Sequence, residues 1–117
     1  MTTQAIADRL VALCRQGQYE AAQNELYHAD AESFEPNSPF VPYVKGLDAI
    51  KAKGTQFQSQ IETFYGTEVS DPIVAGNYIS CSISLDCDFK GHGRVDMREI
   101  ALYEVKDGKI VKETFYY

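Results

Sequence analysis

A stretch in which hydrophobic and polar residues alternate, Tyr78–Phe89, constrains the fold of this chain most strongly. The odd-numbered positions are all hydrophobic: Ile79, Cys81, Ile83, Leu85, Cys87 and Phe89. The even-numbered positions are tyrosine, serine or aspartate. Successive side chains of a β-strand point to opposite faces of the sheet. The pattern therefore predicts a strand with one face in the core and the other in solvent.

Further strands are predicted around this stretch. Residues 67–71 and 73–75 are short candidates, and residues 95–105 and 109–117 are long ones. Gly91-His92-Gly93 separates the two longest strands, and Asp107-Gly108 is a strong hairpin signal before the last. Consecutive strands joined by short turns predict an antiparallel meander that is long enough to curve.

Three helices are predicted before these strands. Thr2 or Thr3 can cap the first, which Gly17 ends. The second runs from Tyr19 to about His28, where hydrophobic residues recur at helical spacing.

The third helix is predicted to begin at Gly46-Leu47-Asp48 and to continue to Phe64, with Gly66 as its stop. Residues 30–36 are expected to be extended. Three prolines between positions 36 and 44 make the following loop stiff and non-helical.

Helices followed by a meander are typical of an α+β fold. We expect three N-terminal helices packed on a strongly curved, mixed but mostly antiparallel sheet, in one domain spanning residues 1–117. The other sheet face carries serines in one strand but Ile100 and Leu102 in the next. Because a partly apolar outer face is typical of association, we expect a homodimer through the sheet face.

Composition narrows the range of partners. The formal net charge is −6, so nucleic acid and anionic membrane surfaces, which attract basic proteins, are not expected partners. No apolar run approaches the roughly 20 residues that span a bilayer. The N-terminal residues lack the features of a signal peptide, so we expect a cytoplasmic protein.

The cysteines and histidines do not indicate a metal site. The three cysteines, Cys14, Cys81 and Cys87, form no C-x-x-C pair, and there are only two histidines. We therefore expect free, mostly buried thiols, with no metal, no disulfide framework and no cofactor.

Glu99 is the most unusual residue of the predicted strand 95–105. Its alternating neighbours are apolar or amphipathic: Val95, Met97, Ala101, Tyr103 and Val105. A lone carboxylate on a core-facing row is costly unless it is paired or hydrated in a cavity. We interpret Glu99 as a pocket residue with Tyr103 beside it. The alternatives are a place near a sheet edge, bending to solvent, or a row that faces outward.

The face on which Glu113 lies depends on the hairpin at Asp107-Gly108. With a two-residue loop, residue 105 pairs with 110 and Glu113 shares a face with Leu102. With a three-residue loop, residue 105 pairs with 109, and Glu113, Phe115 and Tyr117 share the face of Glu99 and Tyr103. A slip of one residue exchanges the two faces. In the second register, Glu99 and Glu113 would be diagonal neighbours, which would raise the pKa of one of them.

Two other candidates lie before the third helix. Glu35 precedes Pro36 and has a solvated loop carboxylate as its alternative. Tyr43 follows the last of the three prolines and could line a pocket mouth or simply pack. Tyrosines, of which the chain has eight, are common in ligand cavities and equally common in sheet cores.

Four segments, taken in order along the whole chain, resemble the SnoaL-like branch of the nuclear transport factor 2-like superfamily: Arg9–Leu13 with Gly17, Asp30-Ala31 with Glu35-Pro36, Lys45–Ile50, and Tyr103–Val111. That superfamily includes ketosteroid isomerases and polyketide cyclases. The resemblance implies a cystatin-like cone with a pocket between the helices and the concave sheet face, and it often implies homodimers.

The resemblance favours the three-residue loop at Asp107-Gly108, because the family's last strand places alternate large side chains in the pocket from that parity. It also implies roles for single residues. Glu35 falls on the position of the isomerases' general base, a carboxylate just before a proline. Their two oxyanion donors fall on Leu10 and near Ala101, neither of which can donate. Such donors typically contribute about 100-fold or more each in rate.

We interpret the chain as binding a small, largely apolar molecule. As an isomerase or cyclase without a cofactor, it would use Glu35 or Glu99 to move a proton on an enolisable substrate. The expected ligand-binding residues are Tyr43, Tyr103, Glu113, Phe115 and Tyr117. The alternatives are a pocket that binds without chemistry and a dimeric accessory domain.

Overall fold

The computed structural model describes residues 1–117 as three helices and seven strands. In chain order they are α1 (Thr3–Arg15), α2 (Tyr19–Leu26), β1 (Tyr27–Phe34), β2 (Tyr43–Lys45), α3 (Leu47–Ser59), β3 (Ile61–Val69), β4 (Ile73–Ala75), β5 (Tyr78–Phe89), β6 (Gly93–Lys106) and β7 (Lys109–Tyr116).

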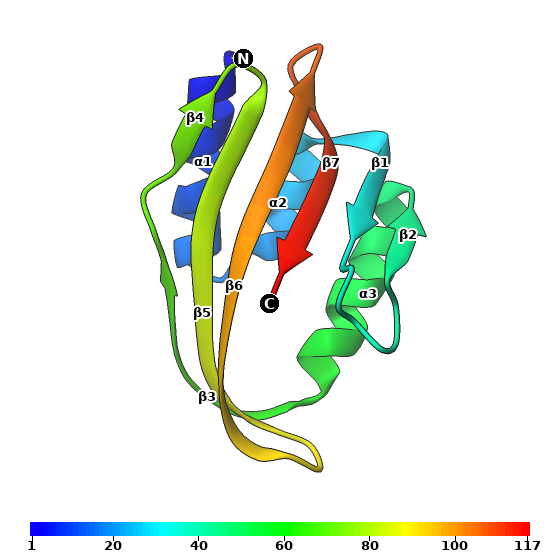
Figure 1. The fold of residues 1–117 in the computed structure, drawn as a ribbon, viewed down its shortest axis with the longest axis vertical. Helices are drawn as coiled ribbons and strands as arrows, with labels where there is room; N and C mark the ends of the chain where they lie inside the picture. The colour runs from blue at the N-terminus through cyan, green and yellow to red at the C-terminus, as the bar shows by residue number, and fades with distance from the viewer.

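The strands form one mixed sheet in the order β2-β1-β7-β6-β5-β3, with β4 paired to β5. Only β1 and β7 run parallel, whereas the other pairs are antiparallel. All three helices lie behind the sheet in the view of Figure 1, on the side that we call the inner face. The predicted α+β fold, with its mixed and mostly antiparallel sheet, is confirmed.

The core lies between the inner face of the sheet and the first two helices. Thr2 caps α1 by accepting a hydrogen bond from the backbone of Ala5, which contributes roughly 1 kcal/mol. Ile6 and Leu10 of this helix are almost fully buried. Burial of a side chain of this size stabilises the fold by about 1.5–3 kcal/mol. Gly17 has φ 71°, a left-handed conformation in which glycine ends the helix without strain.

Strand β5, which was predicted from the alternating pattern, has the predicted bounds, Tyr78–Phe89. Ile79, Cys81 and Cys87 are buried, whereas Ser82 is exposed. All three cysteines are free and buried. The neighbouring strand β1 begins directly after α2, three residues earlier than the extended segment that we predicted.

The predicted end of the third helix at Phe64 is wrong, because α3 ends at Ser59. Ile61 and Phe64 share helical spacing with the apolar face of α3, but they belong to β3 and pair with β5. Residues 61–65 are mostly β-branched or aromatic, which favours a strand once a partner is present. Gly66 is not a helix stop and lies inside β3, beside a register shift.

The hairpin between β6 and β7 combines features of both predicted registers. Asp107 and Gly108 have φ 52° and 76°, and Val105 pairs with Ile110, so the loop has two residues. The three-residue loop that we favoured is therefore wrong. However, the ladder shifts by one residue beyond Val105, and Glu113 pairs with Tyr103. This β-bulge moves Glu113 onto the inner face, the face given by the register that we favoured.

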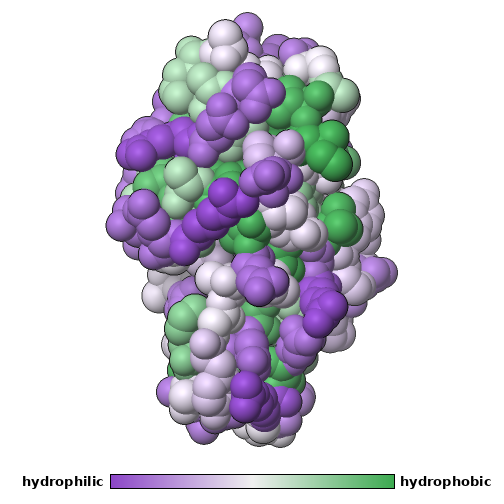
Figure 2. Space-filling view, turned by 90° about the vertical axis from the view of Figure 1, so that its left-hand side faces the viewer, coloured by the Kyte–Doolittle hydropathy of each residue, from purple (hydrophilic) through white to green (hydrophobic).

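The side of the molecule formed by α1, β4 and β3 shows hydrophobic residues in small groups between hydrophilic ones (Figure 2). None of the three helices is long and apolar enough to cross a membrane.

Candidate functional site

Polar and ionisable side chains from four parts of the chain converge on the inner face. We call this group the inner-face cluster and define it as Ser33, Glu35, Lys53, Glu99 and Glu113. Ser33 and Glu113 are partners in the parallel β1–β7 ladder, Lys53 comes from α3, and Glu99 comes from β6. The cluster therefore depends on contacts between distant segments.

Glu113 is the most deeply buried member of the cluster, with 2% of its surface exposed. The Tyr27 hydroxyl donates a hydrogen bond to its carboxylate. Burial raises the pKa of Glu113, whereas Tyr27, Lys53 and Ser33 act in the opposite direction. A carboxyl group in this position is held by its partners, so it has little freedom to contact a ligand.

Lys53 connects α3 to β1. Its ammonium group donates to the Ser33 hydroxyl at 2.6 Å and pairs with Glu35 Oε2 at 2.7 Å. The ammonium nitrogen also lies 5.7 Å from the centre of the Phe115 ring. Ile50, which is 1% exposed, precedes Lys53 by three residues, so both side chains lie on the face of α3 that packs against the fold.

Glu35 is held at the start of the proline loop. Its backbone N–H donates to the carbonyl of Pro42 at 2.8 Å. Its carboxylate binds Lys53 through one oxygen and accepts from the Tyr117 hydroxyl at 3.0 Å through the other. Tyr117 is fixed in turn, because Asn37 donates to its carbonyl at 2.9 Å. Both oxygens of the expected general base are thus already engaged.

Glu99 differs from the other carboxylates because it makes no hydrogen bond or ion pair and is half-buried. Strand β7 ends opposite Ile100, so Glu99 has a ladder partner, Ile83, on one side only. Burial and the charges of Glu35 and Glu113 raise the pKa of Glu99 to about 7, whereas Lys53 lowers it. A carboxyl group with this pKa can accept or donate a proton near neutral pH.

Tyr103 and Phe115 form the apolar side of the site. Their rings lie edge to face at 6.3 Å, and Tyr103 is 2% exposed. Every fully occluded side-chain oxygen or nitrogen has a hydrogen-bond partner. The Tyr103 hydroxyl makes no such bond, so its oxygen must reach space that a water molecule can contact.

The structure brings together six of the seven predicted site residues and places Tyr43 elsewhere. Tyr43 pairs with Phe34 in the ladder, and their rings lie 4.8 Å apart. Its hydroxyl donates to Glu32, also outside the cluster. Tyr43 therefore packs on the face opposite to Ser33, and its place at a pocket mouth stays a prediction.

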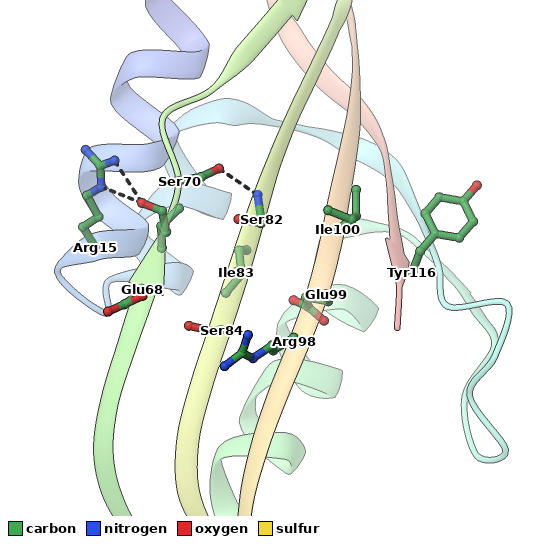
Figure 3. Close-up of a pocket in the computed structure, with 11 residues that line it drawn as sticks. Arg15, Glu68, Ser70, Ser82, Ile83, Ser84, Arg98, Glu99, Ile100 and Tyr116 are labelled. Atoms are coloured by element: carbon green, nitrogen blue, oxygen red, sulfur yellow. Dashed lines mark hydrogen bonds between the residues drawn. The ribbon is translucent and has the colours of Figure 1, made fainter.

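An open hollow of about 750 Å³ lies mostly over the outer face. Figure 3 shows Arg15 at one border and Tyr116 at the other, with β5 and β6 between them. Glu99 is the only predicted site residue that lines it. The expected pocket between the helices and the concave sheet face, over the rest of the cluster, stays a prediction.

Comparison with known proteins identifies the family. The family model for the SnoaL-like domain matches residues 1–117. This chain belongs to the SnoaL-like family. No curated protein sequence matches it.

Solved structures agree with this assignment. A Mesorhizobium loti protein assigned to the SnoaL-like polyketide cyclases is 33% identical, with 100% of both chains covered and a TM-score of 0.94. A Xanthomonas campestris protein with a cystatin-like fold is 19% identical, with 98% and 89% covered and a TM-score of 0.81. A Catenulispora acidiphila protein with a ketosteroid isomerase-like fold, in complex with trimethylamine, is 17% identical, with 99% and 87% covered and a TM-score of 0.75.

Three residues of this SnoaL-like protein's site were missed by the sequence analysis: Tyr27, Ser33 and Lys53. Lys53 lies three residues after Ile50 and four before Phe57, a spacing that placed it on the buried face of the helix. Ser33 and Ala31 alternate with Glu32, which indicated a buried row in β1. No local sequence pattern indicated that Tyr27 would contact Glu113, because most of the chain separates the two residues.

Proposed function

We propose that this SnoaL-like protein binds a small, largely apolar molecule on its inner face and uses Glu99 to move a proton on it. The observation that carries the proposal is the position of Glu99. It is a half-buried carboxylate without a partner, on the same face as Tyr103 and the Lys53–Glu35 pair. The relation to a protein assigned to the polyketide cyclases supports an isomerase or cyclase reaction.

The proposed reaction begins with the ionised form of Glu99. Its carboxylate takes a proton from a carbon next to a carbonyl group, and the C–H bonding electrons move to the carbonyl oxygen to give an enolate. In an isomerisation, protonated Glu99 returns the proton to another carbon. In an aldol-type cyclisation, the enolate carbon attacks a second carbonyl and Glu99 protonates the new alkoxide. Neither route consumes a co-reactant, and a carboxyl pKa near the working pH suits both steps.

This proposal assigns Glu35 and Glu99 different roles. Glu35 has both carboxylate oxygens occupied, by Lys53 and Tyr117, so we expect it to position Lys53 rather than to act as the base. Glu99 is free to approach a substrate. Tyr103, Phe115 and Tyr117 would supply the apolar walls and hydroxyl groups that orient it.

A second candidate function is ligand binding without chemistry. It is favoured by Leu10 and Ala101, which are 2% and 0% exposed and occupy the positions that the resemblance aligns with the oxyanion donors of the isomerases. Apolar side chains at these positions donate no hydrogen bond, so they cannot stabilise the negative charge of an enolate.

The test of the proposal is proton exchange rather than turnover of one chosen substrate. A panel of small ketones is incubated with the protein in deuterated buffer, and NMR follows the replacement of α-hydrogen by deuterium. We expect exchange that falls by about 100-fold or more in Glu99→Gln, the range for loss of a general base. Glu104→Gln is the matched control, since Glu104 lies on the same strand but on the other face. Ketone binding without exchange would support the second candidate.

We also propose that two copies associate through the outer sheet face. Tyr78, Ile100 and Tyr116 are 50%, 50% and 47% exposed there, and exposed hydrophobic side chains that gather on one face are typical of interaction surfaces. Sedimentation equilibrium at micromolar concentration should give a dimer, and Ile100→Asp should give a monomer. A wild-type monomer at that concentration would contradict this proposal.

A further inference from the structure

Lys53 carries a hydrogen-bond donor that the structure does not use. An ammonium group has three N–H donors. Two of them bind the Ser33 hydroxyl at 2.6 Å and Glu35 at 2.7 Å. No third acceptor lies within hydrogen-bond distance, and the nitrogen lies 5.7 Å from the Phe115 ring centre.

Lys53 and Glu99 carry opposite charges on the same face of the sheet. Both side chains lie on the inner face, and no ion pair joins them, so Lys53 Nζ and the Glu99 oxygens are more than 4.0 Å apart. Because the two charges do not pair with each other, each can contact its own end of a polar ligand group. A ligand carbonyl with its neighbouring C–H group has the polarity that fits: the oxygen toward Lys53 and the hydrogen toward Glu99.

We propose that Lys53 is the electrophile of this site and that its free N–H binds the carbonyl oxygen of an enolisable ligand, whose negative charge it stabilises after Glu99 has taken the proton. This inference rests on the proposed function and names the group that replaces the missing oxyanion donors. Leu10 and Ala101 leave the site without them, whereas a positioned ammonium group stabilises an oxyanion by charge as well as by hydrogen bonding.

The balance of charge around Lys53 agrees with this role. The proton transfer moves one negative charge from Glu99 to the ligand oxygen, so the total charge of the site does not change. The charge ends next to the single cation of the cluster. The carboxylate of Glu35 would weaken this attraction, but its other oxygen accepts from Tyr117, which spreads its charge. Ser33 and Glu35 together fix the direction of the remaining N–H.

The probe for this inference is 4-nitrophenol, a planar compound whose ionised oxygen mimics an enolate and whose ionised form absorbs visible light. Titration of the bound probe with pH gives its apparent pKa in the site. We expect wild-type protein to bind the ionised form at least tenfold more tightly than Lys53→Met does. Lys51→Met is the control, because Lys51 lies on the same helix and makes no hydrogen bond or ion pair. Should Lys53→Met fail to fold, Lys53→Gln keeps donors for Ser33 and Glu35 but lacks the charge.

The outcomes separate the two proposals. If the probe binds and its ionisation is the same in wild type and in both Lys53 variants, the role of Lys53 is overturned while Glu99-dependent proton exchange can still stand. If Lys53 controls the probe but Glu99→Gln leaves exchange unchanged, the proposed base is overturned and the oxyanion site remains. If neither form of the probe binds to wild type at millimolar concentration, the role of Lys53 is overturned, and the ketone exchange assay alone decides on Glu99.

Discussion

Tyr103 and Glu113 lie opposite each other in the β6–β7 ladder only because β7 has one residue more than β6 between the hairpin turn and this pair. The Val105–Ile110 pair and the Tyr103–Glu113 pair are two residues apart along β6 but three residues apart along β7. Val111 is the extra residue that forms the bulge. The bulge gives the inner face its buried carboxylate.

Deletion of Val111 should therefore preserve the site. The ladder beyond the bulge already pairs Glu104 with Lys112, so the shortened chain forms a regular two-residue hairpin with the same pairing. We expect NMR contacts between the backbones of Tyr103 and Glu113 to persist. A Glu113 carboxyl that becomes solvent-exposed, with a titration near 4.3, would contradict the bulge as the cause of its position.

Glu99 should make the protein less stable as the pH rises. Its pKa is raised from 4.5 to about 7 in the folded state. Between these values the folded state keeps a proton that the unfolded state has released, so the free energy of unfolding decreases with increasing pH across this window. At about 1.4 kcal/mol for each pKa unit, the whole effect is about 3 kcal/mol.

Urea unfolding of wild type and Glu99→Gln tests this dependence. The two proteins should differ little at pH 4.5, and the variant should be the more stable above pH 7, since it never carries the unfavourable charge. Glu104→Gln should follow the wild-type curve. A Glu99→Gln variant that is less stable than wild type at pH 8 would show that the carboxylate has a partner in solution.

Tyr27→Phe should destabilise the fold by about 1–3 kcal/mol, the typical effect of removing one partner of a buried hydrogen bond. The Tyr27 hydroxyl stabilises the charged form of Glu113, so its loss should raise the pKa of Glu113 further, measured by carbon NMR of the carboxyl group. Tyr43→Phe is the control. Its hydroxyl binds Glu32 on an exposed face, and its removal should change stability by about 0.5 kcal/mol or less.

The cysteines should be nearly inert towards thiol reagents in the folded protein. Burial raises the pKa of Cys14 to about 12 and that of Cys81 to about 11, and the thiolate is the reactive form. Ellman's reagent at pH 8 should modify them only at the rate of unfolding, and all three thiols should react at once in 6 M guanidinium chloride. Rapid modification of the native protein would show that the region between α1 and β5 opens.

The sequence was most informative where local pattern and tertiary structure agree. The alternation in β5 and the turn residues of the hairpins predicted the meander, because a half-buried strand has to alternate. The end of α3 was mispredicted, since Ile61 and Phe64 satisfy both helical and strand spacing and only pairing with β5 decides between them. Glu99 was identified as a lone carboxylate on an apolar row, and Glu113 as its neighbour in one of two hairpin registers. Lys53 and Tyr27 belong to the site through contacts with distant segments.

The parallel pairing of β1 with β7 has a kinetic consequence. These strands are separated by most of the chain, and pairs this distant close slowly, because the entropy of a long loop has to be lost before the contact forms. Tyr27 and Ser33 come from one strand and Glu113 from the other. An intermediate that has formed the β3–β5–β6 meander but not yet added β1 would therefore contain Glu99 and Tyr103 but none of this network. Binding competence should appear together with the last folding phase.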